Sequence, residues 1–145
     1  MTAAGGLDEA FMPAATVPGQ VRTLLGFRLT EWGLPSGAPD VFLIADELVT
    51  NAMRSTPSAE IRVHFTRERG GVLLRVWDAS DAMPVVKPVV ELTLDDVRPD
   101  AQALDPGHDD GTGGWGLPIV RALSARCGVD RTEPSGKWVW SFVAC

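Results

Sequence analysis

The sequence predicts an α+β fold, a two-layer α/β sandwich in which helices cover one face of a mixed, largely antiparallel sheet. Three observations favour it: two early segments with apolar residues at helical spacing, an alternating apolar and polar stretch across a tight turn, and a closing helix followed by two strand-like runs. The 145 residues suit one domain, which we place at 11–145 behind a flexible leader at 1–10.

The first elements are expected to be a short strand and two helices. Residues 11–17 suit an edge strand, because two prolines would interrupt a central strand there. From Pro18 to Trp32 the apolar residues recur every three or four positions, until a glycine and a proline stop the pattern. The same spacing at 41–52, before another proline, predicts the second helix.

The remaining elements are expected to be a hairpin, a third helix and two closing strands. Residues 61–66 alternate apolar and polar side chains, and residues 72–78 are rich in β-forming types after an Arg-Gly-Gly turn. Residues 117–127 have helical spacing, and strands are expected at 129–132 and 137–143.

Charge and composition narrow the classes of partner. A formal net charge of -6 disfavours direct binding to a nucleic-acid backbone and favours a protein or nucleotide partner. The two cysteines are too few for a disulfide framework or a metal cluster. No signal-like start and no apolar run near the roughly 20 residues that cross a bilayer are present, so we expect a cytoplasmic protein without membrane contact. A segment rich in proline and aspartate, at about 82–111, is expected to be a lid or disordered.

Glu47 and Asn51 are the first candidates for chemistry. They lie four residues apart in the second predicted helix, so both side chains leave one face, one turn from each other. An amide oxygen is a suitable neutral ligand for Mg²⁺, and a neighbouring carboxylate can accept a proton from an attacking water or hydroxyl. An ordinary solvated polar pair has the same spacing and, on spacing alone, is the commoner explanation.

Two further segments offer ligand-binding groups. Asp78 ends a predicted strand, where a carboxylate can accept a hydrogen bond from the exocyclic amino group of a base, although an Asx-turn is the commoner role. The loop Gly111–Leu117 has four glycines before a helix, which lets backbone N–H groups approach a phosphate. It matches neither the P-loop nor the dinucleotide fingerprint, so a flexible connector is an equal alternative.

Taken in order, these motifs resemble the N, G1 and G2 boxes of the GHKL (Bergerat-fold) ATPase superfamily, which includes gyrase, histidine kinases and mismatch-repair ATPases. They are Glu-x-x-x-Asn on a helix, Asp-x-Ser after a strand and Gly-x-Gly-Gly-x-Gly-Leu before a helix. The small size and the segments 47–52, 78–80 and 136–140 look most like the single-domain anti-sigma-factor serine/threonine kinases of actinobacteria. The likeness covers about residues 11–143.

The resemblance implies ATP and Mg²⁺ as cofactors. It implies that Glu47 is the general base, that Asn51 holds Mg²⁺ against the triphosphate, and that Asp78 recognises the adenine amino group. It also implies a sigma factor and an antagonist (anti-anti-sigma) protein as partners, and relatives often form homodimers. The other residues implied in nucleotide binding are Ser80, Gly111, Thr112, Gly113, Gly114, Trp115, Gly116 and Leu117.

Three positions depart from the pattern of the relatives. Many relatives carry histidine where Ser55 stands and arginine where Trp115 stands, and Trp138 occupies what looks like the position of a threonine that helps bind adenine. The resemblance therefore leaves open a kinase and an inactive module of the same fold that acts by capturing proteins. A detached histidine-kinase ATPase domain is disfavoured, because the chain has no helix pair with a phosphoacceptor histidine.

Overall fold

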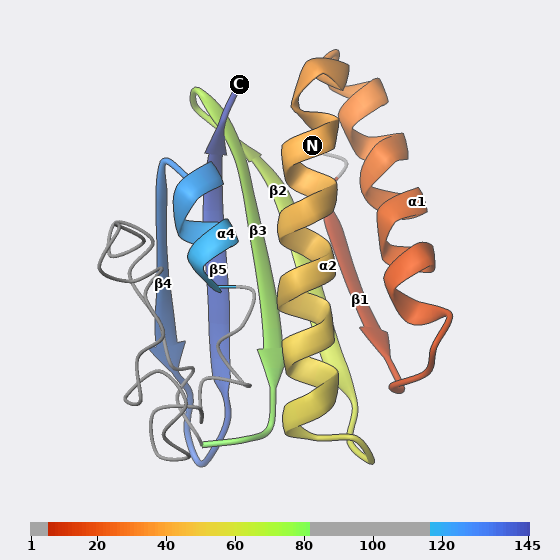
Figure 1. The fold of residues 1–145 in the computed structure, drawn as a ribbon, viewed down its shortest axis with the longest axis vertical. Coiled ribbons are helices and arrows are strands. Elements are labelled where there is room, and N and C mark those ends of the chain that lie inside the picture. Colours follow the sequence, from red (N-terminus) through yellow and green to blue (C-terminus); the bar gives the residue numbers. More distant parts are fainter. Residues whose placement is uncertain (1–5, 82–116) are drawn as a thin grey trace, which may run out of the picture.

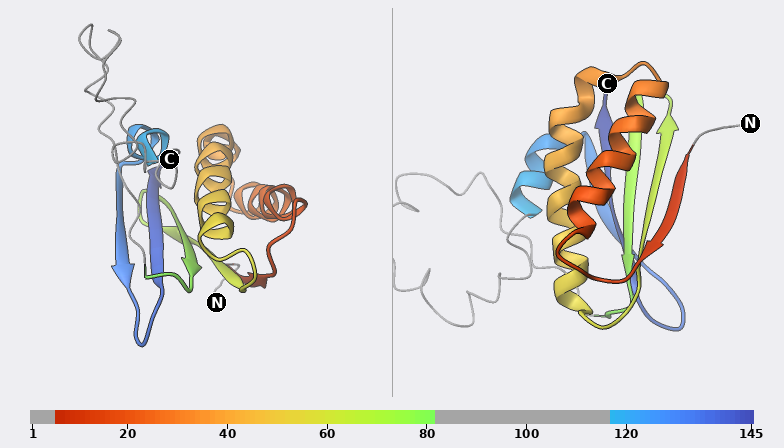
Figure 2. Two further views of the ribbon diagram at one scale, coloured as in Figure 1. Left: turned by 60° about the horizontal axis from the view of Figure 1, so that its bottom comes forward. Right: turned by 90° about the vertical axis from the view of Figure 1, so that its right-hand side faces the viewer.

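In the computed structural model, which describes residues 6–81 and 117–145, helices pack on one face of a five-stranded sheet (Figure 1). The strand order is β1-β2-β3-β5-β4, and every neighbouring pair is antiparallel. Figure 2 shows α1, α2 and α4 on the same side of the sheet, which confirms the predicted sandwich. The elements are β1 (Leu7–Phe11), α1 (Val17–Glu31), the 3-10 turn η1 (Pro35–Gly37), α2 (Ala38–Ser55), β2 (Ile61–Glu68), β3 (Gly71–Asp78), α4 (Leu117–Leu123), β4 (Arg126–Arg131) and β5 (Lys137–Ala144).

The edge strand exists but lies earlier in the chain than predicted. β1 is Leu7–Phe11 rather than residues 11–17, and Leu7 pairs with Phe65 of β2. Leu7 is buried in the core, whereas three of the four residues that follow it are exposed. The strand therefore has too few apolar positions to be recognised from the sequence, and residues 7–10 belong to the sheet rather than to the predicted leader.

The two long helices confirm the periodicity of the first third of the chain. The buried positions of α1 are spaced by four residues, and those of α2 form a wider stripe that faces the sheet. An ion pair of 2.7 Å between Arg22 and Asp46 links the two helices at the surface. The helix residues buried in the core are Val17, Val21, Leu25, Leu29, Val41, Ile44, Ala45, Leu48, Val49 and Ala52.

The hairpin and the closing strands place the end of β3 beside the start of β5. The predicted hairpin is confirmed as β2 and β3, and β5 pairs with β3 over its whole length, with Asp78 opposite Lys137.

The last helix ends at Leu123, four residues before the predicted end, because the backbone N–H of Ala125 donates to the carbonyl of Phe142 at 2.8 Å and the chain joins the sheet. Cys127, which the apolar spacing places on this helix, lies in β4.

The other face of the sheet carries aromatic rings and guanidinium groups, and we call it the open face. The ring of Trp138 lies 4.8 Å from the ring of His64, and the guanidinium of Arg75 lies 4.5 Å above Trp138. Arg126 lies 4.7 Å from the centre of the Phe142 ring in the same way. A groove of about 520 Å³ on this face is lined by Arg75, Arg126 and Phe142 among others.

Candidate functional site

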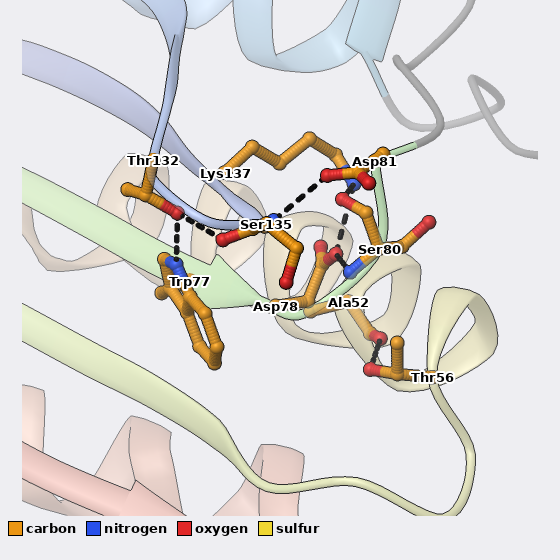
Figure 3. Close-up of polar contacts among 10 residues, drawn as sticks. Ala52, Thr56, Trp77, Asp78, Ser80, Asp81, Thr132, Ser135 and Lys137 are labelled. Atoms are coloured by element: carbon orange, nitrogen blue, oxygen red, sulfur yellow. Dashed lines mark hydrogen bonds and ion pairs between the residues drawn. The ribbon is translucent and has the colours of Figure 1, made fainter.

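Asp78, at the end of β3, is the centre of a buried polar cluster (Figure 3). Its Oδ1 accepts a hydrogen bond of 2.8 Å from the Nζ of Lys137 and one of 2.9 Å from the backbone N–H of Ser80. Lys137 also donates to the carbonyl oxygen of Ser80 at 3.2 Å. Each side chain of the ion pair is only 3% exposed. The predicted Asx-turn is therefore present, and the same carboxylate also binds an ammonium group.

A second layer of contacts fixes this cluster to the turn between β4 and β5. The backbone N–H of Gly136 donates to Asp81 at 2.9 Å, and the indole N–H of Trp77 donates to Thr132 at 3.0 Å. Gly136 has a φ of 93°, and a Cβ atom there would lie 2.7 Å from the carbonyl oxygen of Asp78. Only glycine adopts this backbone conformation and approach without strain. The turn thus holds Lys137 in place opposite Asp78.

Glu47 and Asn51 lie one turn apart on α2 and are both half-buried. The Nδ2 of Asn51 is buried and has no hydrogen-bond partner, and Glu47 makes no polar contact with any residue that the structure describes. A buried amide without a partner is costly and is unusual in a folded protein. The pair thus differs from an ordinary solvated pair, because the Nδ2 of Asn51 is shielded from water and has no partner among the described residues.

The fold brings the two candidate segments to the same end of one side of the sheet. α2 packs against β3, and Figure 1 shows that the C-terminal end of α2 and the end of β3 lie at the same edge of the molecule. Ser55 is the last residue of α2. Asn51, in the last turns of α2, and Asp78 therefore lie toward the same edge of the molecule, although no hydrogen bond joins them among the described residues.

The phosphate-loop residues 111–116 lie outside the described residues, as does the expected lid. Leu117 is the first residue of α4, which packs against α2. The end of the loop is therefore on the helix side of the sheet, the side that carries Asn51 and Asp78.

The described residues fit a Mg²⁺ ion that arrives with a nucleotide. They contain no group of three or more His, Cys, Asp or Glu side chains that could hold a metal by themselves. Mg²⁺ usually keeps several waters and takes one or two protein oxygens together with substrate phosphates. The amide oxygen of Asn51 is of the type that can supply one such ligand, whereas the unpartnered Nδ2 of the same side chain is a hydrogen-bond donor.

The structure places Trp138 away from the side of the sheet that carries Asp78, although its position in the sequence looks like that of an adenine-binding threonine, and it adds Lys137 to the site. Side chains alternate along a strand, so Trp138 points to the open face, where it contacts His64 and Arg75. Lys137 points to the helix side, where it reaches Asp78. The available signal was the alternation along β5, which puts Lys137 on one side with Val139, Ser141 and Val143, and Trp138 on the other with Trp140 and Phe142.

Comparison with known proteins agrees with the fold. The family model described as the histidine kinase-like ATPase domain matches residues 14–141. A search among curated proteins finds no match to the chain. None of the helices in the described ranges is long and apolar enough to cross a membrane. The family implies ATP binding, and its match spans α1, α2, the last four strands of the sheet and the region between β3 and α4. The chain belongs to the histidine kinase-like ATPase domain family.

Proposed function

We propose that the chain is an ATP-binding anti-sigma regulatory protein that phosphorylates a serine of an antagonist protein. The observation that carries the proposal is the place of Asn51, whose buried Nδ2 has no hydrogen-bond partner among the described residues, one helical turn from Glu47 and on the side of the sheet that carries Asp78. From the resemblance of the motifs we propose a sigma factor and an antagonist protein as partners. We also propose a homodimer as the assembly and the cytoplasm as the site of action.

The proposed transfer needs few protein groups. The serine oxygen attacks the γ-phosphorus of ATP, the bond from that phosphorus to the bridging oxygen breaks, and ADP leaves. Glu47 accepts the serine proton, and the amide oxygen of Asn51 would hold a Mg²⁺ ion, which would supply positive charge to neutralise the phosphates. Phosphoryl transfer depends mainly on positioning and electrostatic stabilisation, so these groups suffice if the glycine loop binds the phosphates.

A second candidate is an inactive module of the same fold that acts only by capturing partner proteins. The observation that favours it is the ion pair of 2.8 Å between Asp78 and Lys137, which already occupies one oxygen of the carboxylate expected to bind adenine. The departures at Ser55 and Trp115 point the same way.

Thermal unfolding with and without ATP and Mg²⁺ tests the nucleotide site. A ligand at a hundredfold its dissociation constant stabilises a protein by about 2.7 kcal/mol, so a clear rise in Tm is expected. The absence of a shift at millimolar nucleotide would reject ATP binding and favour the capture module.

Transfer of labelled phosphate from ATP to a candidate antagonist tests the kinase. Glu47→Ala is expected to abolish transfer and to leave the ATP-dependent rise in Tm in place. Glu60→Ala is the matched control, because Glu60 is exposed and has no polar contact within the described ranges. Equal transfer by wild type and Glu47→Ala would remove Glu47 from the mechanism.

A further inference from the structure

The Asp78–Lys137 pair has bonding capacity that the protein does not use. Both hydrogen bonds to the carboxylate end on Oδ1, and no residue in the described ranges donates to Oδ2. The ammonium of Lys137 has three N–H groups, of which two go to Asp78 and to the carbonyl of Ser80. The third has no acceptor among the described residues.

These unused groups differ in kind and lie side by side. Oδ2 of Asp78 is an acceptor, and the third N–H of Lys137 is a donor. The two groups are neighbours because the Nζ of Lys137 is bonded to the other oxygen of the same carboxylate at 2.8 Å. The side chains of the pair are each only 3% exposed, so few water molecules can reach these groups. A ligand that offers both a donor and an acceptor on one edge would satisfy both groups.

The position of Lys137 is fixed before any ligand arrives. Lys137 stands opposite Asp78 in the β3–β5 register, directly after Gly136, whose backbone N–H is held by Asp81. The long lysine side chain therefore has little freedom to turn away, and its ammonium stays beside the carboxylate.

We infer that Lys137 determines base specificity together with Asp78, and that the pair accepts 6-oxopurine as well as 6-aminopurine nucleoside triphosphates. The inference rests on the proposed binding of ATP at this site. A carboxylate alone accepts hydrogen bonds, so it favours the 6-amino group of adenine and repels the 6-carbonyl of hypoxanthine. With an ammonium beside it, Lys137 donates to the carbonyl while Asp78 accepts from the adjacent ring N–H.

Isothermal titration of the full chain with ATP, ITP and inorganic tripolyphosphate, each with Mg²⁺, tests the inference. We expect the dissociation constants of ATP and ITP to agree within about tenfold, and tripolyphosphate to bind far more weakly because it lacks a base. Lys137→Met is expected to weaken ITP relative to ATP by about tenfold to a hundredfold, since one charged hydrogen bond is lost.

Arg131→Met is the matched control, because it removes the same charge from the residue paired with Lys137 in β4. Arg131 is exposed and makes no ion pair with any residue described, so the ratio of ITP to ATP affinity should stay unchanged. An equal change of this ratio in both variants would mean that only overall charge matters, and would overturn the inference.

The remaining outcomes separate this inference from the proposed function. Wild type that binds ATP more than about a hundredfold tighter than ITP overturns the inference and leaves ATP binding standing. Tripolyphosphate that binds as tightly as ATP also overturns the inference, because the protein then does not recognise the base. No binding of any nucleotide rejects the proposed function itself. If Lys137→Met does not fold, the wild-type ratio decides alone.

Discussion

The two faces of the sheet differ in whether their charged side chains have a counter-ion. On the helix side of β3, Val72, Leu74 and Val76 lead to a single charged residue, Asp78, whose partner is a buried ammonium. On the open face of the same strand, Arg75 lies over a tryptophan ring and makes no ion pair with any described residue. Next to water a cation needs no counter-ion, whereas a buried carboxylate does. The buried pair is therefore the feature that packing alone does not explain.

Breaking the buried pair should have the largest effect on stability. Lys137→Met leaves Asp78 almost fully buried without its cation, and removing one partner of such a pair costs about 3–5 kcal/mol of the free energy of unfolding. Chemical denaturation measures it. The double variant Asp78→Asn, Lys137→Met removes both charges and should regain most of the loss. A single variant as stable as wild type would show that the pair is not buried in solution.

Neighbouring leucines in β3 compare the two faces directly. Leu74 is 1% exposed on the helix side, and Leu73 lies half-buried on the open face. Leu74→Ala should cost about 2–5 kcal/mol, because it leaves a cavity in the core. Leu73→Ala should cost about 1 kcal/mol or less, because water can fill the space. Equal losses in denaturant unfolding would mean that a partner covers the open face.

The sequence predicts the parts of this contrast that depend on residues close together in the chain, and it does not predict the parts that depend on residues far apart in the chain. The spacing of apolar residues predicts α1, α2 and the hairpin, because each pattern is local. The same spacing continues to Cys127, although α4 ends at Leu123, because a backbone hydrogen bond to β5 draws the chain into the sheet. The pairing of Asp78 with Lys137 joins residues 59 apart, so no local pattern contains it.

The candidate site was predicted unevenly for the same reason. Glu47 and Asn51 share a helix face by their spacing, which the sequence states directly. The register that puts Lys137 rather than Trp138 opposite Asp78 is a property of two strands that meet only in the folded chain. The unpartnered state of Asn51 depends on burial, which spacing does not give.

Gly136 ties the buried pair to the β4–β5 turn, so its substitution should have an intermediate effect. Gly136→Ala places a Cβ atom against Trp77 and Asp78 at a φ of 93°, and should cost about 1–3 kcal/mol in denaturant unfolding. Gly33→Ala is the control, because Gly33 also has a positive φ but an added Cβ meets nothing within 4 Å. A larger loss at Gly33 would mean that the close approach at Gly136 is absent.

The smallest effect is expected for the cations of the open face. Arg75→Gln removes the guanidinium over Trp138 and should lower the free energy of unfolding by about 0.5–1 kcal/mol. Arg67→Gln is the control, since Arg67 is exposed on the neighbouring strand and has no polar contact among the described residues. A loss at Arg75 as large as that at Leu74 would contradict the comparison, because a cation next to water would then stabilise the fold as strongly as a buried aliphatic side chain.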